Sequence, residues 1–142
     1  MFVVCLTFIL SFWSMTITSR AEMVKRSRLE YSAIAASDVL IKSSGTPSNW
    51  EDNITGLKMI GLASSPNVLS LNKLSNFSAL DYSIQKTMIG IDLEYYFYLE
   101  YANGTKIFSN GNSSLSGSQI TVIRRIALLG NETVSMVLFA YG

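Results

Sequence analysis

The chain has 142 residues, of which 49% are hydrophobic and 15% are charged, and its formal net charge is +1. One domain of about 100 residues fits beside the apolar N-terminal stretch. The near-neutral charge does not suggest the basic stripe that nucleic-acid binding requires, so no nucleic-acid partner is expected. The absence of histidine and the single cysteine exclude histidine-based triads, histidine-ligated zinc and an intrachain disulfide. Cys5 is interpreted as a small apolar residue, with lipidation as the alternative.

Residues 1–44 contain neither glycine nor proline, the residues that most readily end a helix. They predict one uninterrupted helix, about 60 Å long. Residues 1–19 place large apolar side chains on every side, which is typical of a membrane segment or of a helix among other apolar helices. The residues expected to form this filament-core or membrane segment are Phe2, Val3, Leu6, Phe8, Ile9, Leu10, Phe12, Trp13 and Ile17.

Residues 20–44 are amphipathic and are expected to pack on a folded head formed by residues 45–142. The face predicted to contact the head carries Leu29, Ala33, Ala36 and Leu40. A basic cluster follows the apolar segment and consists of Arg20, Lys25, Arg26 and Arg28. We interpret this cluster as a solvated, membrane-flanking face, with an anion or lipid site as the alternative.

The helix is expected to end at Gly45 in the left-handed conformation. Trp50 is expected to plug the junction between helix and head, with recognition by an exposed side chain as the alternative. Residues 57–63 predict a strand. Residues 69–89 predict two short helices that dock on the sheet, the first through Leu71, Leu74 and Phe77.

The strongest strand pattern covers residues 91–101, where apolar and mixed positions alternate. Asn103-Gly104 favours a type I′ hairpin turn into residues 105–109. After a polar loop at 110–118, residues 120–129 and 133–141 predict a second hairpin. The expected fold class is therefore α+β, with a long N-terminal helix packed on a small, mostly antiparallel sheet of four or five strands and short helices.

Carboxylates and aromatic rings share the outer face of strand 91–101. Asp92, Glu94 and Glu100 could form a pair for glycoside hydrolysis or bind calcium, but a solvated strand face is the simpler interpretation. Tyr96 and Tyr98 are candidate contacts with sugars or a neighbouring subunit, as is Trp50. No metal or other cofactor and no catalytic residue is expected.

Five Asn-x-Ser/Thr triplets follow the apolar segment, which favours a head outside the cell. The alternative is a chain with asparagine-rich turns that never meets a glycosyltransferase. The candidate acceptors of N-linked glycans are Asn53, Asn76, Asn103, Asn112 and Asn131. Because the basic residues follow the apolar stretch, the distribution of positive charge favours the opposite orientation. A basic leader before the apolar stretch would reconcile the two, and a cleaved secretory signal is the competing explanation.

A series of short stretches in a fixed order resembles archaeal type IV pilins and pilin-like secreted proteins. These stretches are 37–41 (SDVLI), 45–50 (GTPSNW), 60–63 (IGLA), 66–70 (PNVLS), 73–74 (KL), 80–82 (LDY) and 90–98 (GIDLEYYFY). The resemblance covers roughly residues 37–105. It implies a basic leader removed by a prepilin peptidase, although none precedes the apolar run, and Cys5 lies where many pilins have an acidic residue.

The resemblance implies a structural subunit of an extracellular pilus-like filament, with a glycosylated head exposed on the cell surface. The apolar helix would lie in the membrane before assembly and in the filament core afterwards. Its partners would be other copies of the chain and the pilus assembly machinery. The alternatives are a membrane-anchored extracellular adhesion or binding module that does not polymerise and, less favoured, a secreted enzyme released by signal cleavage.

Overall fold

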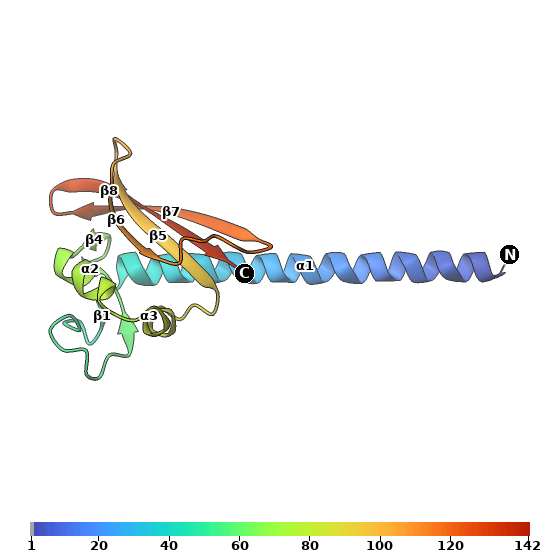
Figure 1. Cartoon of the computed structure of the whole chain (residues 1–142), viewed down its shortest axis with the longest axis horizontal. Coiled ribbons are helices and arrows are strands. Elements are labelled where there is room, and N and C mark those ends of the chain that lie inside the picture. Colours follow the sequence, from blue (N-terminus) through green and yellow to red (C-terminus); the bar gives the residue numbers. More distant parts are fainter. Residues whose placement is uncertain (1) are drawn as a thin grey trace.

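The computed structural model describes residues 2–142, with the side chains of residues 2–6, 8, 12 and 14–16 left out of the description. The fold is α+β, with one long N-terminal helix projecting from a head built around a mixed sheet (Figure 1). The elements in chain order are α1 (Phe2–Lys42), β1 (Gly45–Thr46), β2 (Met59–Ile60), β3 (Ala63–Ser65), β4 (Val68–Leu69), α2 (Leu71–Ser78), α3 (Tyr82–Ile89), β5 (Glu94–Tyr101), β6 (Lys106–Gly111), β7 (Ile120–Leu129) and β8 (Glu132–Tyr141).

Across residues 2–142, the main sheet has six strands in the order β3-β4-β7-β8-β5-β6. Its pairs are antiparallel except β4 with β7, which is parallel. The expected hairpins β5–β6 and β7–β8 are confirmed. β8 lies between β7 and β5, with Phe97 of β5 opposite Leu138 of β8. The sheet has more strands than expected because β3 and β4, each of two or three residues, extend one edge.

The C-terminal half of α1 packs on one face of this sheet, as predicted. The prediction came from apolar residues that follow one another at intervals of four, three and four positions. Leu29, Ala33, Ala36 and Leu40 are all buried. Two small alanines let the helix approach the strands closely. Ser37 lies on the same contact, where its hydroxyl donates to the carbonyl of Ile34.

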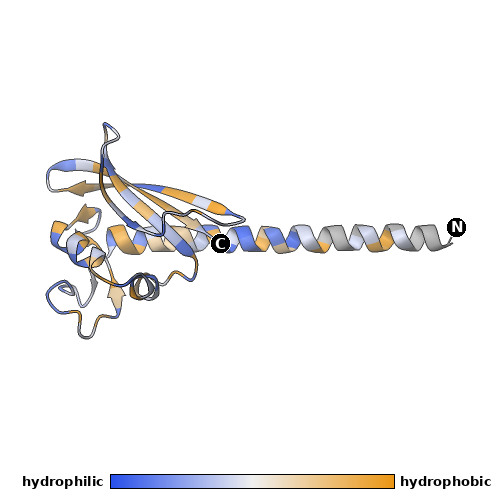
Figure 2. Ribbon diagram, viewed as in Figure 1, coloured by the Kyte–Doolittle hydropathy of each residue, from blue (hydrophilic) through white to orange (hydrophobic). Residues whose placement is uncertain are grey.

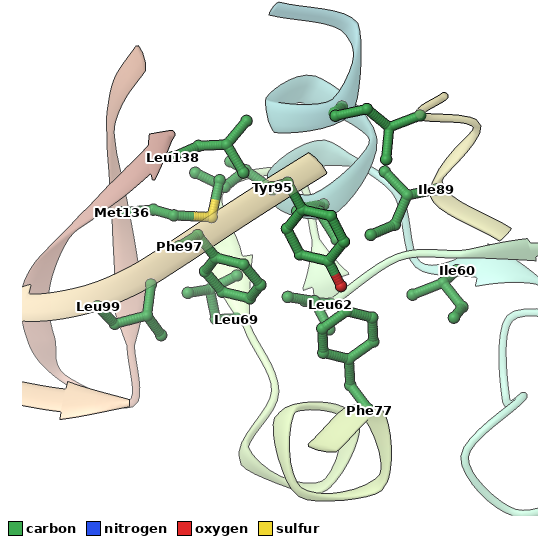
Figure 3. Packing of buried hydrophobic residues seen from close by; sticks show 14 of the residues in the cluster. Ile60, Leu62, Leu69, Phe77, Ile89, Tyr95, Phe97, Leu99, Met136 and Leu138 are labelled. Atoms are coloured by element: carbon green, nitrogen blue, oxygen red, sulfur yellow. The ribbon is translucent and has the colours of Figure 1, made fainter. Parts of the chain in front are cut away.

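Two short helices complete the core, with α2 near the C-terminal end of α1 and α3 beside α1 (Figure 1). Figure 3 shows Phe77 of α2 pointing toward Tyr95 and Phe97 of β5, and the Phe77 and Phe97 ring centroids are 6.0 Å apart. Leu74 and Phe77 are buried as predicted, whereas Leu71 is 67% exposed, so its expected docking is wrong. Leu71 is the first residue of its helix, and the buried face of that helix is formed by Lys73, Leu74 and Phe77 instead.

Gly45 has the expected left-handed conformation, with a φ of 88°, but it does not cap the helix. Helix α1 ends at Lys42, and backbone amides from a distant segment bind its last carbonyl groups. Leu62 N donates to Leu40 O at 3.0 Å, and Asn67 N donates to Ile41 O at 3.0 Å. This pairing splits the single strand expected at 57–63 into β2 and β3, because the intervening residues bind the helix end instead of a strand.

The β5–β6 hairpin has a different turn from the predicted type I′. Asn103 does not have a positive φ, whereas Gly104 does, at 83°. Gly104 N donates to Tyr101 O at 2.9 Å, and Tyr101 N donates to Thr105 O at 3.0 Å. This is a three-residue loop in which a type I turn is followed by a left-handed glycine and a bulge. A separate irregularity follows in β6, where Glu100 pairs with Lys106 but Leu99 pairs with Phe108, so the register shifts by one residue at Ile107.

Candidate functional site

The projecting half of α1 exposes large apolar side chains. Those of Ile9, Leu10, Trp13 and Ile17 are all about 60% exposed or more, with Trp13 at 68%. Phe2, Val3, Leu6, Phe8 and Phe12, which complete the expected filament-core segment, have side chains outside the described residues. Among the residues that the structure describes, no helix carries an apolar stretch long enough to cross a bilayer.

An exposed seam runs along α1 on the side away from the head. It consists of Leu10, Trp13, Ile17, Arg20, Val24, Ser27 and Tyr31, which follow one another at alternating spacings of three and four. This is the heptad spacing with which one helix packs against another. The seam continues past the projecting half, because Val24 and Tyr31 are at least 70% exposed alongside the head. Figure 2 shows the polar residues near the middle of α1 that interrupt its apolar character.

The basic cluster lies where α1 enters the head. Lys25 Nζ donates to Ser118 Oγ at 3.1 Å, and Arg28 lies 3.8 Å from Asp92 in an exposed ion pair. An exposed pair at that distance contributes little to stability. The described contacts of the cluster therefore fit a solvated face that touches the loop before β7.

The expected aromatic contacts occupy different environments. Trp50 is fully buried and its indole nitrogen donates to Gly61 O at 2.9 Å, so its candidate contact role is wrong and it plugs the junction. Tyr96 and Tyr98 are partly exposed on the sheet face opposite α1. Their rings and that of Phe139 form a cluster with all three centroid distances at 6.1 Å.

The three candidate carboxylates have separate cationic partners. Asp92 is paired with Arg28, and Glu100 Oε1 lies 2.9 Å from Arg124 Nη1. Glu94 Oε1 lies 2.6 Å from Lys86 Nζ. Each carboxylate is thus part of a different ion pair, which does not resemble a catalytic pair. Within the described residues, no group of three or more acidic or cysteine side chains could hold a metal ion.

Glu94 lies in a network that joins α3 to the start of β5. Tyr82 Oη donates to Glu94 Oε2 at 3.1 Å and accepts from Tyr95 N at 3.0 Å, and Asn112 Nδ2 donates to Glu94 Oε2 at 3.3 Å. The Lys86 ammonium, followed by these other donors, holds the pKa of Glu94 below its usual value. Burial raises the pKa of Tyr82 to about 12, and the nearby Glu94 carboxylate adds to the shift.

The Glu94 network predicts a pH-dependent contribution to stability. Because the folded-state pKa is lowered, this contribution is present above the unfolded-state pKa, near 4.5, and is lost as pH falls through the folded-state value. We expect Glu94→Gln to lower the melting temperature at pH 7 by an amount equivalent to less than about 1 kcal/mol, since the pair is partly exposed. That difference should shrink below pH 4.

Thermal unfolding from pH 3 to 8 measures this effect. The exposed Glu132→Gln is the matched control and should follow the wild-type curve at each pH. A Glu94→Gln deficit that stays constant down to pH 3 would contradict the assignment.

The candidate glycan acceptors fall into two groups. Asn53, Asn103 and Asn131 are exposed in loops or hairpin turns. Asn76 lies in α2, where its side-chain amide donates to Asn72 O at 3.0 Å, and the amide of Asn112 contacts Glu94. A sugar on either of these two nitrogens would disturb an existing hydrogen bond, so the three turn positions are the better acceptors.

Sequence reasoning missed two buried polar side chains that organise the head. Lys73 of α2 is 3% exposed, and its ammonium binds Ser44 O at 2.6 Å, Ser48 O and the Glu51 carboxylate at 3.1 Å. Gln85 of α3 joins α2 to β5 through both ends of its amide. An amphipathic pattern ordinarily places lysine and glutamine in solvent, so no local signal identified them.

Comparison of the chain with protein-family models, with curated proteins and with solved structures found no match. The resemblance to pilins remains an expectation from the sequence stretches that carry it. The described residues themselves offer an exposed helical seam and a partly aromatic sheet face as candidate functional surfaces.

Proposed function

We propose that this chain is a structural subunit of an extracellular, archaeal type IV pilus-like filament. It polymerises when helices of neighbouring copies cover the exposed seam of α1. The head remains outside this helical core, and the sugars on its turns form an outer coat. Other copies of the chain and an assembly machinery are its partners, and the membrane holds the apolar segment before assembly.

The single observation that carries the proposal is the heptad-spaced seam on the side of α1 that faces away from the head. A soluble monomer rarely leaves five large apolar side chains along one side of a helix in water, as the seam does at every position except Arg20 and Ser27. Covering five such side chains would contribute about 2 kcal/mol each, or about 10 kcal/mol per copy before the cost of association. Since the seam lies along a straight helix, copies can add lengthwise, as a filament requires.

Ser11, in the apolar half of α1, fits a helix with apolar neighbours. The Ser11 hydroxyl donates to its own helix at Thr7 O, at a distance of 2.8 Å. This bond satisfies the hydroxyl without water, so the side chain can lie among neighbouring helices at low cost.

Trp13→Glu tests the proposal because it places a carboxylate between Leu10 and Ile17, in the apolar part of the seam. A carboxylate buried among helices without a partner costs several kcal/mol, so we expect the yield of filaments to fall at least tenfold. Leu71→Glu is the matched control, since Leu71 is equally exposed and apolar but lies on the head. Electron microscopy of material sheared from cells measures the yield, and near-UV circular dichroism in detergent confirms that both heads fold.

Two results would refute the filament proposal. One is a normal yield of filaments from Trp13→Glu. The other is wild-type material that consists of soluble monomers from which the residues before Arg20 have been removed, as mass spectrometry of the N-terminus would show.

A further inference from the structure

The sheet face opposite α1 carries mostly apolar side chains, although no other element within the described residues covers most of it. In most antiparallel sheets with one packed face, the other face is polar. Here the strands place aromatic and aliphatic side chains outward. We call this surface the outer face, and it consists of Tyr96 and Tyr98 on β5, Val122, Ile126 and Leu128 on β7, and Phe139 on β8.

The side chains of the outer face are more exposed to solvent along β7 than along β5 and β8. Val122 is 52% and Ile126 is 69% exposed. The three aromatic rings lie against one another and are partly exposed. At one end, the loop before β7 covers the face, because Tyr141 Oη donates to Asn112 O at 2.7 Å and Tyr141 is buried. The rest of the face is available for a partner.

The two charges at the centre of the outer face neutralise each other, and one lysine lies at its edge. Arg124 and Glu100 form an ion pair across β8, with 2.9 Å between Nη1 and Oε1. Lys106, on the edge strand β6, lies with its ammonium 4.1 Å from the centroid of the Tyr98 ring. An anionic membrane or a nucleic acid would require several unpaired cations. Because Arg124 and Glu100 at the centre of the outer face are paired, two identical faces can pack together there without repulsion between like charges.

The candidate glycan acceptors leave the outer face bare. Asn103 and Asn131 lie in the hairpin turns at one end of the sheet, beyond the ends of the strands. Asn112 follows β6 at the other end, and Asn53 and Asn76 belong to the loop and helix on the other side of the head. Sugars at every acceptor would therefore surround the face without covering its centre.

We propose that the outer face binds the outer face of a second copy, with the two sheets packed face to face. Strands of up to ten residues in four neighbouring rows give a face of roughly 30 by 19 Å. Two copies would then bury at most about 1,100 Å² in total, because the loop before β7 covers one end of the face, and this is the size of a weak interface. One such contact is weak, but many along a filament act together.

In a filament with α1 inside, the outer face points away from the axis. The contact would therefore join two filaments side by side. This consequence depends on the proposed filament, whereas the contact between two faces does not.

Cross-linking of the full chain in mild detergent tests the contact itself. In a Cys5→Ser background, Val122→Cys places a thiol on the outer face and Leu71→Cys places one on the head surface elsewhere. With a short bismaleimide linker, we expect at least tenfold more dimer from Val122→Cys. Adding Ile126→Lys should abolish that dimer, while adding Ile54→Lys, a change at another exposed apolar residue, should not. Equal cross-linking at the two cysteines, or no effect of Ile126→Lys, would overturn the proposal.

Electron microscopy separates this proposal from that of the filament. We expect wild-type filaments to associate in pairs or bundles and Ile126→Lys filaments to remain single. Wild-type filaments that are as dispersed as those of Ile126→Lys would overturn lateral association while leaving the filament intact. Absence of filaments would overturn the filament and the lateral association, and cross-linking in detergent would still decide whether the two faces meet.

Discussion

Lys73→Met should destabilise the head by about 2–4 kcal/mol, because it removes a buried cation and leaves its partners unpaired. The Lys73 ammonium binds Ser44 O, Ser48 O and the carboxylate of Glu51, and it lies 5.8 Å from the centroid of the Trp50 ring. It therefore holds the loop that leaves α1 against α2. Without it, two carbonyl groups and a carboxylate that is 17% exposed lose their donor.

Thermal unfolding of the full chain in detergent measures this loss, which corresponds to a fall in melting temperature of roughly 10–20 °C. Lys58→Met is the matched control, because Lys58 is an exposed lysine of the adjoining loop, and it should change the melting temperature by less than 2 °C. A double variant, Lys73→Met with Glu51→Met, should recover part of the loss, since no charge is then left unpaired. If Lys73→Met had the same melting temperature as Lys58→Met, the Lys73 ammonium would not stabilise the junction between α1 and α2.

The repeating pattern of apolar residues correctly predicted α1 and β5, because each of these elements is long and has one face that packs in the core. The four-three-four spacing of Leu29, Ala33, Ala36 and Leu40 identified the buried face of α1, and strict alternation identified β5. Both patterns repeat over many residues, so each position supports the others. The helix thus ended within two residues of its predicted end, at Lys42.

The sequence could not show which partner each apolar surface has. On β7, one set of alternate residues carries Ile123 and Ala127, and the other carries Val122 and Ile126, so both faces are apolar. Only the position of α1 decides that the first set is inside. The candidate outer face was therefore missed, although Tyr96 and Tyr98 at its centre were identified from the same alternation in β5.

Contacts over long sequence separations decided the remaining differences. The sequence favoured Trp50 as a plug of the junction but left an exposed recognition role open, and the loop folds back so that the indole nitrogen donates to Gly61 O. Lys73 is buried because the residues that bind it are 25 and 29 positions away. Neither partner leaves a local pattern, because a backbone carbonyl is present at every position.

Gly61→Ala should prevent stable folding of the head, since Gly61 lies directly against the end of α1. A Cβ added there would be 2.0 Å from Ser43 O and 2.6 Å from Gly45 N, and both are backbone atoms that no rotamer change can move. The neighbouring bonds, Leu62 N to Leu40 O and Ala63 N to Ser43 O, hold the two segments together. Relieving the clash would break these bonds, so we expect a loss above about 3 kcal/mol.

Gly104→Ala is the control, because it shows the cost of placing alanine in a left-handed backbone conformation without a clash of the added Cβ. Gly104 has a φ of 83° and no heavy atom within 4 Å of an added Cβ, so alanine there should cost only about 1–2 kcal/mol for the left-handed backbone. Near-UV circular dichroism follows the packing of Trp50, whose indole binds the carbonyl of Gly61. We expect Gly61→Ala to lose this signal at 25 °C and Gly104→Ala to retain it. Equal stability of the two variants would mean that the segment at Gly61 can move away from α1, and that the helix end does not depend on its contact with residues 61–63.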